Sequence, residues 1–562
     1  MRLRHSLLVA TALLALAACD NTRREAPGKT TEVTVTLNKP VQTADMAAPA
    51  PPPPPMMSMP NVGLARGVVA PSSPGPYWQP ENTSKFPQAE ANPIKVAADE
   101  PVSTFSIDVD TASYGVVRDY LLQQNAMPPA DAVRVEEMVN YFDYAYPLPD
   151  DRKTPFRAST AVYPTPWNPE TRILHIGIKG FDLPKTNRPP ANLVFLIDTS
   201  GSMAEPNKLP LLKSAFHLLV DQLGEKDRVA IVAYAGSAGV VLEPTSGADK
   251  RKILGALDRL EAGGSTAGGE GIRLAYQLAE RSGIAGGVNR VLLATDGDFN
   301  VGITDPKALE GYVIGERDKG VDLTCLGFGD DNYNDAMMQK IAQAGNGNAA
   351  FIDTMNEARK VFVEQVAGTL FTIAKDVKIQ IEFIPARVAE YRLIGYETRL
   401  LNRTDFNNDK VDAGDIGSGH TVTALYEITP VGSKSVMADP LRYKERVKGD
   451  PFGELAFLKI RYKRPGESAS RLITTPITDA DVVEDFARLP TDMRFAAAVA
   501  GSAELLRHDP YVKDFGFERA IAIAEDAKGD DRFGYRREFI ALLRAADKAE
   551  GMKPLDGSHS GG

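Results

Sequence analysis

Between residues 190 and 374, short apolar runs alternate with segments of helical periodicity, and this alternation constrains the fold more than any other feature of the chain. The run 193–197 (LVFLI) is apolar at every position, as expected of a parallel strand buried on both faces. Further strand-like runs lie at 229–234, 240–242, 291–294 and 323–328, and helical patterns at 209–223, 249–260, 270–282, 306–318, 334–344 and 356–374. The alternation predicts an α/β domain with a doubly wound, mostly parallel sheet, which binds ligands at the carboxyl ends of its strands.

Strand-like segments also lie on both sides of this α/β unit. They are 102–107, 156–163 and 172–180 before it, and 377–384, 388–395, 421–428, 454–463 and 470–475 after it. We therefore predict that the α/β unit is inserted into a β-sandwich-like domain. Helical patterns at 111–124, 131–143, 492–507, 515–527 and 534–547 predict helical N- and C-terminal parts.

The first residues have the pattern of an export signal. Two arginines precede an apolar run at 7–18, which is shorter than the ~20 residues that a membrane-spanning helix needs. The run ends in Leu-Ala-Ala-Cys19, which resembles the bacterial lipobox, a motif whose cysteine is lipidated. The resemblance implies a lipid anchor at Cys19 on a protein facing the periplasm or the exterior, and Asp20 favours the inner membrane. A plain secretory signal that contains a cysteine is the alternative.

The segment after Cys19 is rich in proline. Residues 46–80 include 11 prolines in 35 positions and a single charged residue, Arg66. Such a composition cannot bury enough apolar surface to fold, so we predict a disordered tether over 19–95.

Three polar loops follow predicted elements of the α/β unit. Asp198-Thr-Ser200-Gly-Ser202 follows the strand 193–197, a Gly-Gly-Ser-Thr266 loop follows the helix 249–260, and Asp296 follows the strand 291–294. Their hard oxygen ligands suit Mg²⁺, Mn²⁺ or Ca²⁺ better than zinc or copper. Because the ends of neighbouring parallel strands lie together, we expect these loops to converge on one ion. The alternatives are a polar cluster that caps helices and turns, and a metal site that has lost its use.

These five positions resemble the metal-ion-dependent adhesion site of the von Willebrand factor A-type (VWA) domain, whose pattern is Asp-x-Ser-x-Ser, then Thr, then Asp. The resemblance implies that Ser200, Ser202 and Thr266 coordinate the ion directly or through water. It implies that Asp198 and Asp296 act largely through water. It also implies one open coordination position, which a carboxylate of a partner protein fills.

Three further blocks are similar to those of a bacterial family of VWA lipoproteins with family-specific domains on both sides of the VWA domain. They are 105–114 (FSIDVDTASY), 134–142 (RVEEMVNYF) and 414–426 (GDIGSGHTVTALY). The resulting division is a signal peptide 1–18, tether 19–95, N-terminal domain 96–189, VWA domain 190–375, C-terminal β region 376–480, C-terminal helices 481–550 and disordered tail 551–562.

Together the residues and the resemblance predict a lipid-anchored, non-enzymatic binding or adhesion-type protein of the cell envelope, which captures an Asp or Glu of a protein partner or an acidic group of a glycan. The net charge of −10 and the lack of a concentrated basic stripe argue against a nucleic-acid partner. One alternative is a Mg²⁺-dependent phosphotransferase with Asp108 and Asp110, whose spacing resembles haloacid-dehalogenase-type nucleophiles, although Ala112 departs from that motif. Another is a scaffold in which the metal is purely structural.

Three further features of the sequence are weaker evidence of function. The acidic segment 405–412 is calcium-loop-like, but Lys410 stands where an EF-hand needs Gly and Ile416 where it needs Glu, which favours a solvated acidic turn. His420 follows a glycine-rich turn and is a candidate surface residue. Cys325 lies within the strand 323–328 and is expected to be a small buried apolar residue.

Overall fold

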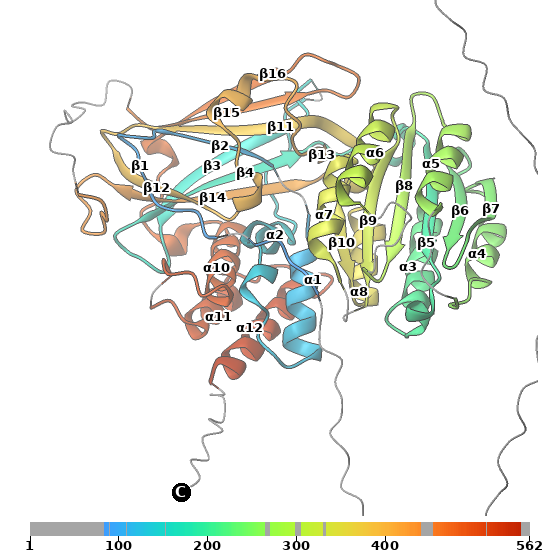
Figure 1. The fold of residues 1–562 in the computed structure, drawn as a ribbon. Coiled ribbons are helices and arrows are strands. Elements are labelled where there is room, and N and C mark those ends of the chain that lie inside the picture. The colour runs from blue at the N-terminus through green and yellow to red at the C-terminus, as the bar shows by residue number, and fades with distance from the viewer. Residues whose placement is uncertain are drawn as a thin grey trace, which may run out of the picture. The chain divides into compact units, whose positions relative to one another are not determined.

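The computed structural model describes residues 84–551, except 89, 108–109, 152, 265–269, 298–304, 330–332, 440–452 and 513. Within these residues one largely parallel sheet and two antiparallel sheets are packed with helices (Figure 1). No helix in the described ranges is long and apolar enough to cross a membrane.

The α/β unit is built on a six-stranded sheet in the order β10-β9-β8-β5-β6-β7 (Figure 1). Its strands are β5 (Ala191–Asp198), β6 (Arg228–Tyr234), β7 (Ala238–Ser246), β8 (Val288–Thr295), β9 (Asp322–Phe328) and β10 (Ala349–Ile352). Neighbouring strands pair in parallel, apart from the antiparallel hairpin of β6 and β7. The predicted doubly wound, mostly parallel sheet is confirmed. The edge strand β10 was not predicted, because its four residues are too short a run to show a pattern.

Helices cover both faces of this sheet. One group is α3 (Leu209–Gln222), α4 (Lys250–Asp258) and α8 (Met355–Arg359), and the other is α5 (Gly271–Arg281), α6 (Pro306–Asp318) and α7 (Asp335–Ala344). In β5, Phe195 packs with the first group while Val194 and Leu196 pack with the second. Full burial of each such side chain contributes roughly 1.5–3 kcal/mol, which explains why the strand is apolar at every position from 193 to 197.

The flanking regions form two antiparallel sheets packed face to face. One consists of β1 (Lys95–Val96), β12 (Val388–Ile394), β14 (Thr421–Pro430), β4 (Arg172–Gly180) and β3 (Phe156–Pro164). The other contains β13 (Ile416–Gly417), β11 (Thr372–Phe383), β15 (Glu454–Lys463), β16 (Arg471–Thr478) and β2 (Val102–Ser106), which pairs with β11. Ile176 of the first sheet and Ile379 of the second share one core. Because β4 pairs with β14 and β2 with β11, strands from before and after the α/β unit share both sheets, and the predicted insertion is confirmed.

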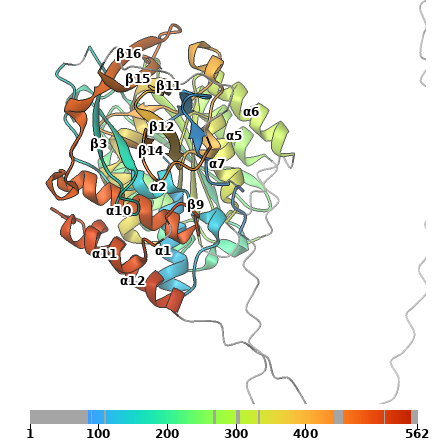
Figure 2. The same ribbon diagram turned by 90° about the vertical axis from the view of Figure 1, so that its left-hand side faces the viewer.

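Helices from both ends of the chain cover the outer face of the first of these sheets. They are α2 (Val135–Asn140), α10 (Thr491–Leu506), α11 (Phe517–Asp526) and α12 (Tyr535–Gly551), and Figure 2 shows α10, α11 and α12 side by side. The helix α1 (Ala112–Arg118) packs on both sides: Tyr114 and Val117 belong to the core of these helices, whereas Ala112 and Val116 pack with β10. A Cβ on Gly115 would come within 2.9 Å of the carbonyl oxygen of Phe351, so only glycine allows this close approach.

The connection from the α/β unit to the sandwich differs from the single helix predicted at 356–374. It consists of α8, a π-helical turn η5 (Lys360–Glu364) and α9 (Val366–Leu370), after which β11 begins at Thr372. Residues 373 and 374 are buried in the sandwich core, and this burial overrides their helical pattern. The Lys360 ammonium, at the π turn, lies 4.2 Å from the ring centre of Tyr141 and 4.6 Å from that of Tyr535.

Candidate metal centre

The loops after β5 and β8 meet at the carboxyl edge of the parallel sheet. Asp198 ends β5 and Thr295 ends β8. The Asp198 carboxylate accepts a hydrogen bond from the Ser200 backbone N–H at Oδ1 (2.8 Å) and one from the Thr295 hydroxyl at Oδ2 (3.2 Å). These bonds fix the orientation of a side chain with no solvent exposure. Burial raises the pKa of Asp198, and the negative charge of Asp296 adds to this rise, while the hydrogen bonds from Ser200 and Thr295 oppose it.

Two serine hydroxyls lie beside this carboxylate. The Oγ atoms of Ser200 and Ser202 are 3.0 Å apart, and Ser200 is buried whereas Ser202 is exposed. Ser200 immediately precedes a 3₁₀ turn, η4 (Gly201–Ala204), but its side chain makes no capping hydrogen bond to that turn. The alternative interpretation of Ser200 as a helix cap therefore finds no support in the geometry.

Asp296 follows β8 directly and is 2% exposed. Its Oδ2 lies 3.4 Å from the Nζ of Lys208, while its Oδ1 is buried with no hydrogen-bond partner among the described residues. Leaving a buried carboxylate oxygen unpartnered costs free energy, and a hard cation is the kind of group that would satisfy it. The donor set thus fits the magnesium-like ion that the sequence implies.

The structure brings together four of the five predicted positions, Asp198, Ser200, Ser202 and Asp296. Thr266 lies outside the described residues, and its role stays a prediction. The segment that leads to it is tied to the first loop, since the Gly201 N–H donates to the Gly264 carbonyl at 3.1 Å. In the described part no group of three or more His, Cys, Asp or Glu side chains has a metal-binding arrangement. An ion at this edge would therefore need the hydroxyls as well as the two aspartates.

The sequence gives only a weak signal for Lys208 as a residue of this site. It directly precedes α3, and its side chain, 3% exposed, reaches across the loops to Asp296. Only the fold brings together these two residues, which are 88 positions apart. A polar loop that ends in a lysine just before a helix is the one signal that the sequence offers.

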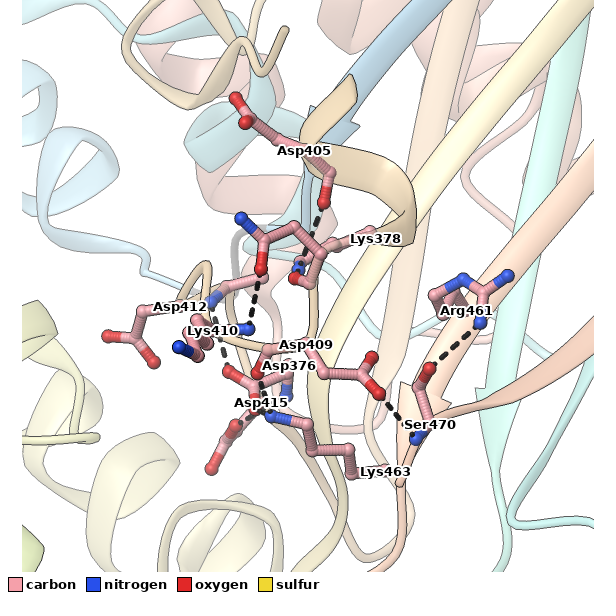
Figure 3. A network of polar contacts seen from close by, with 12 residues as sticks. Asp376, Lys378, Asp405, Asp409, Lys410, Asp412, Asp415, Arg461, Lys463 and Ser470 are labelled. Carbon is pink, nitrogen blue, oxygen red and sulfur yellow. Dashed lines mark hydrogen bonds and ion pairs between the residues drawn. The ribbon is translucent and has the colours of Figure 1, made fainter. Parts of the chain in front are cut away.

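Two lysine side chains donate hydrogen bonds to the acidic segment 405–412 (Figure 3). The Lys378 ammonium donates to the main-chain carbonyls of Asn408 (2.6 Å) and Asp405 (3.3 Å), and Lys463 donates to the main-chain carbonyl of Asp409 (2.6 Å). These ammonium groups supply the positive charge that a calcium ion would bring to an acidic loop. The prediction against an EF-hand site agrees with this arrangement, although Lys378 is buried and the turn is not simply solvated.

Asp110, one of the two residues of the alternative phosphotransferase motif, is buried and already engaged. Its Oδ2 is paired with the Arg399 guanidinium at 2.8 Å, and its Oδ1 accepts the Ala349 backbone N–H at 2.9 Å. Asp108 lies outside the described residues. The carboxylate of Asp110 thus has a structural role, because it links the N-terminal domain to β10 through hydrogen bonding.

His420 is half-buried, at the turn for which the sequence left a surface position open. Its ring lies against Gly368 of α9, and its Nδ1 is buried without a hydrogen-bond partner in the described part of the chain. Burial, followed by the charge of Lys179, lowers the pKa of His420 to about 4. Cys325 is fully buried in β9, as predicted, and burial raises the pKa of its thiol.

Comparisons with known proteins assign this architecture to a family. The family model described as the von Willebrand factor type A domain matches residues 192–365, and the one described as the C-terminal part of the uncharacterized protein YfbK matches residues 368–549. A model described as von Willebrand factor matches residues 80–175.

Curated relatives and solved structures are similar to this chain over different shares of their length. The uncharacterized protein YfbK of Escherichia coli (strain K12) is 47% identical over 475 residues, which cover 83% of this chain and 81% of YfbK. Human inter-alpha-trypsin inhibitor heavy chain H4 is 29% identical over 33% of this chain and 21% of its own length. A solved von Willebrand factor type A protein from Catenulispora acidiphila covers 72% of this chain and 91% of its own, at 18% identity and a TM-score of 0.40. The chain therefore belongs to the YfbK family of VWA-domain proteins.

Proposed function

We propose that this protein is a cell-envelope binding protein whose VWA domain captures an acidic group of a partner protein, or of a glycan, through a divalent cation. The cation, Mg²⁺ or else Mn²⁺ or Ca²⁺, is assigned to Asp198, Ser200, Ser202, Thr266 and Asp296. The observation that carries this proposal is the buried, unpartnered Oδ1 of Asp296 beside the oriented carboxylate of Asp198 and the paired serine hydroxyls. VWA domains in general act as interaction or adhesion modules, which supports the class of function.

The chain's own residues define what such a site recognises. Ser200 and Ser202 contribute neutral oxygens, and Asp198 is held by two hydrogen bonds that keep its carboxylate in place. Neutral hydroxyl ligands leave the charge of a bound hard cation poorly compensated, so the cation offers its open position to an incoming carboxylate. The exposure of Ser202 supports an open position at the surface, within reach of a protein side chain.

We further propose that Cys19 carries the lipid that attaches the protein to the membrane, with the folded part facing the periplasm or the exterior. Replacing Cys19 by Ser would release the protein into the soluble fraction. Metabolic labelling with an alkyne fatty acid, lost in the same variant, is the direct readout. A labelled Cys19→Ser variant would exclude this anchor.

The proposed binding function is tested by a pull-down from detergent-solubilised envelope in the presence of Mg²⁺ or of EDTA, with wild type, Asp198→Ala and Asp296→Asn. We expect a partner that is retained only by wild type with Mg²⁺. The control is Asp258→Ala, which removes an exposed carboxylate of the same domain that pairs with His217. Retention that survives EDTA and both site variants would refute the metal-dependent mechanism.

Two further sets of variants separate the alternatives. If the metal only stabilises loops, Ser200→Ala with Ser202→Ala lowers the melting temperature in Mg²⁺ but leaves the association intact. If the protein is a phosphotransferase, the metal-loaded protein hydrolyses a phosphomonoester and Asp108→Asn abolishes the turnover. The engaged carboxylate of Asp110 argues against this last activity.

A further inference from the structure

A pocket of about 250 Å³ opens beside the segment that joins the VWA domain to the sandwich. The walls of this joint pocket come from 140–143 at the end of α2, 179–182 at the end of β4, 360–368 of the connecting segment, and 418–421 at the start of β14. The pocket thus draws on the N-terminal domain, the connection and the sandwich at once. Small-molecule sites occur preferentially where such parts of a protein meet.

Lys360 contributes a buried side chain to the wall of the joint pocket. It is 3% exposed and begins the π-helical turn η5, an irregularity that is frequent at functional sites. Its Nζ lies against the rings of Tyr141 and Tyr535, and it makes no hydrogen bond or ion pair within the described part of the chain. The rings stabilise the positive charge but offer no oxygen atom to its three N–H groups. A ligand in the pocket would supply that acceptor.

The neighbouring charged groups surround the same pocket. His420 also lines it, and burial lowers the pKa of this histidine to about 4. The charges of Lys179, Asp143 and Lys360 all act on its ring. The two ammonium groups and the carboxylate therefore lie around the pocket together with the imidazole.

The wall of the joint pocket offers both hydrogen-bond donors and acceptors. Lys179 is paired with Asp143 at 3.2 Å, and the side chain of Asp143 is 76% exposed. Glu364 is half-buried and accepts a hydrogen bond from the Tyr535 hydroxyl at 2.8 Å. Gln365 is half-buried and adds a side-chain amide, which donates and accepts.

This mixture favours a neutral, hydroxyl-rich ligand over a free anion. Each hydroxyl of a sugar donates and accepts at once, so one ring can bond to carboxylates and to an ammonium group. A free anion would be repelled by the carboxylates of Asp143, Asp182 and Glu364 in the same wall. The pocket is also smaller than the roughly 300–1,000 Å³ of pockets that take drug-sized ligands, which suits a single small ring.

We propose that the joint pocket binds one neutral sugar unit, whose oxygens accept hydrogen bonds from Lys360 and Gln365 and whose hydroxyls donate to the carboxylates of the wall. This site needs no metal, so it is independent of the cation proposed at Asp198 and Asp296. Because three parts of the chain form the walls, a bound sugar links them and restrains the connecting segment.

The test is saturation-transfer difference NMR on the full chain in EDTA, with N-acetylglucosamine, its linear tetramer, glucose and acetate as probes. We expect transfer to at least one neutral sugar and none to acetate. Lys360→Met should weaken the binding of that sugar by about tenfold or more, because it removes a charged hydrogen-bond donor. Gln365→Ala should weaken it as well, and its side-chain amide makes no hydrogen bond within the described residues. The matched control is Lys340→Met, which removes an exposed lysine of the VWA domain that pairs with Glu310 at 2.8 Å.

A sugar signal that is lost in Lys360→Met and kept in the control supports the site. Tighter binding of the tetramer than of the monomer then assigns the unit to a glycan chain, and equal binding assigns it to a free sugar. No signal from any sugar, or equal signals from wild type and both pocket variants, would overturn the proposal. A signal from acetate alone, lost in Lys360→Met, would overturn the sugar in favour of an anion.

Hydrogen exchange of residues 360–368 keeps the test decisive where Lys360→Met fails to fold. Exchange in wild type should slow when the sugar binds, and this slowing should shrink in Gln365→Ala. Unchanged exchange in wild type would overturn the proposal. Because EDTA is present throughout, either failure leaves the proposed metal-dependent function standing.

Discussion

Replacing Arg118 by Met should strongly destabilise the joint between the VWA domain and the C-terminal helices. The Arg118 side chain is 2% exposed and pairs with three carboxylates. Its Nε donates to Asp353 at 2.8 Å, and its terminal nitrogens donate to Glu357 and Glu538, each at 2.9 Å. Asp353 and Glu357 belong to the connection between β10 and the sandwich, while Glu538 lies on α12.

The magnitude follows from the burial of these partners. Unit charges about 4 Å apart attract by about 4 kcal/mol at an effective dielectric constant of 20, and Arg118 serves three such partners at the cost of its own desolvation. Removing one member of a buried pair typically costs about 3–5 kcal/mol, because the remaining charge stays buried. We expect Arg118→Met to lower the free energy of unfolding by about this amount at neutral pH.

Urea unfolding followed by tryptophan fluorescence and circular dichroism measures this loss. Burial raises the pKa of Glu357 in spite of Arg118, so without the arginine this carboxyl should hold its proton to still higher pH. The loss of stability should therefore be smaller in mildly acidic buffer. The control is Arg281→Met, which breaks an ion pair of similar length with both side chains about two-thirds exposed, and should cost at most about 1 kcal/mol. An Arg118→Met effect as small as that of the control would refute the reasoning.

Three further predictions concern the joint and its neighbourhood. Gly368→Ala would place a Cβ in steric conflict with His420 Cδ2, so we expect the free energy of unfolding, measured in urea, to fall by about 1–3 kcal/mol. Adding His420→Ala should restore part of this stability in the double variant. Burial raises the pKa of Asp415 to about 7, so this carboxyl keeps its proton in the folded state well above the pH at which the unfolded chain loses it. The free energy of unfolding of the wild type therefore falls as the pH rises from about 4 to about 7. Across that window Asp415→Asn should become more stable than wild type, by roughly 1–3 kcal/mol in the free energy of unfolding, with no difference below it. A difference that does not depend on pH would contradict the raised pKa of Asp415. Loading with Mg²⁺ in the presence of the acidic partner should change the hydrogen exchange of residues 355–370, which join the VWA domain to the sandwich. Unchanged exchange would show that ligand binding does not alter the conformation of this connecting segment.

Much of the architecture is predictable because its signals are local. The unbroken apolar run of β5 indicates a strand buried on both faces, and the strand patterns before and after it indicate an inserted domain. The loops after β5 and β8 are predictable as a site for a related reason. Parallel strands bring their carboxyl ends to one edge wherever they lie in the sequence, so Asp198 and Asp296 come together without any local signal that links them.

What the sequence did not predict depends on contacts between distant residues. The break of the connecting segment at Lys360 coincides with the contact of its ammonium with the rings of Tyr141 and Tyr535, which come from before and after the VWA domain. The packing of the His420 ring depends on the close approach of Gly368. Lys208 belongs to the site only because its long side chain crosses Gly329 to Asp296. Periodicity and motif spacing carry no information about such contacts.

The proposed function requires that the loops after β5 and β8 hold one hard cation between Asp198 and Asp296. The most direct test is a crystal of the protein grown with Mn²⁺ and measured for anomalous scattering. We expect a single strong anomalous peak in coordination contact with the hydroxyls of Ser200 and Ser202, next to both aspartates. A map with no peak there, in crystals where Mn²⁺ is in excess, would contradict it.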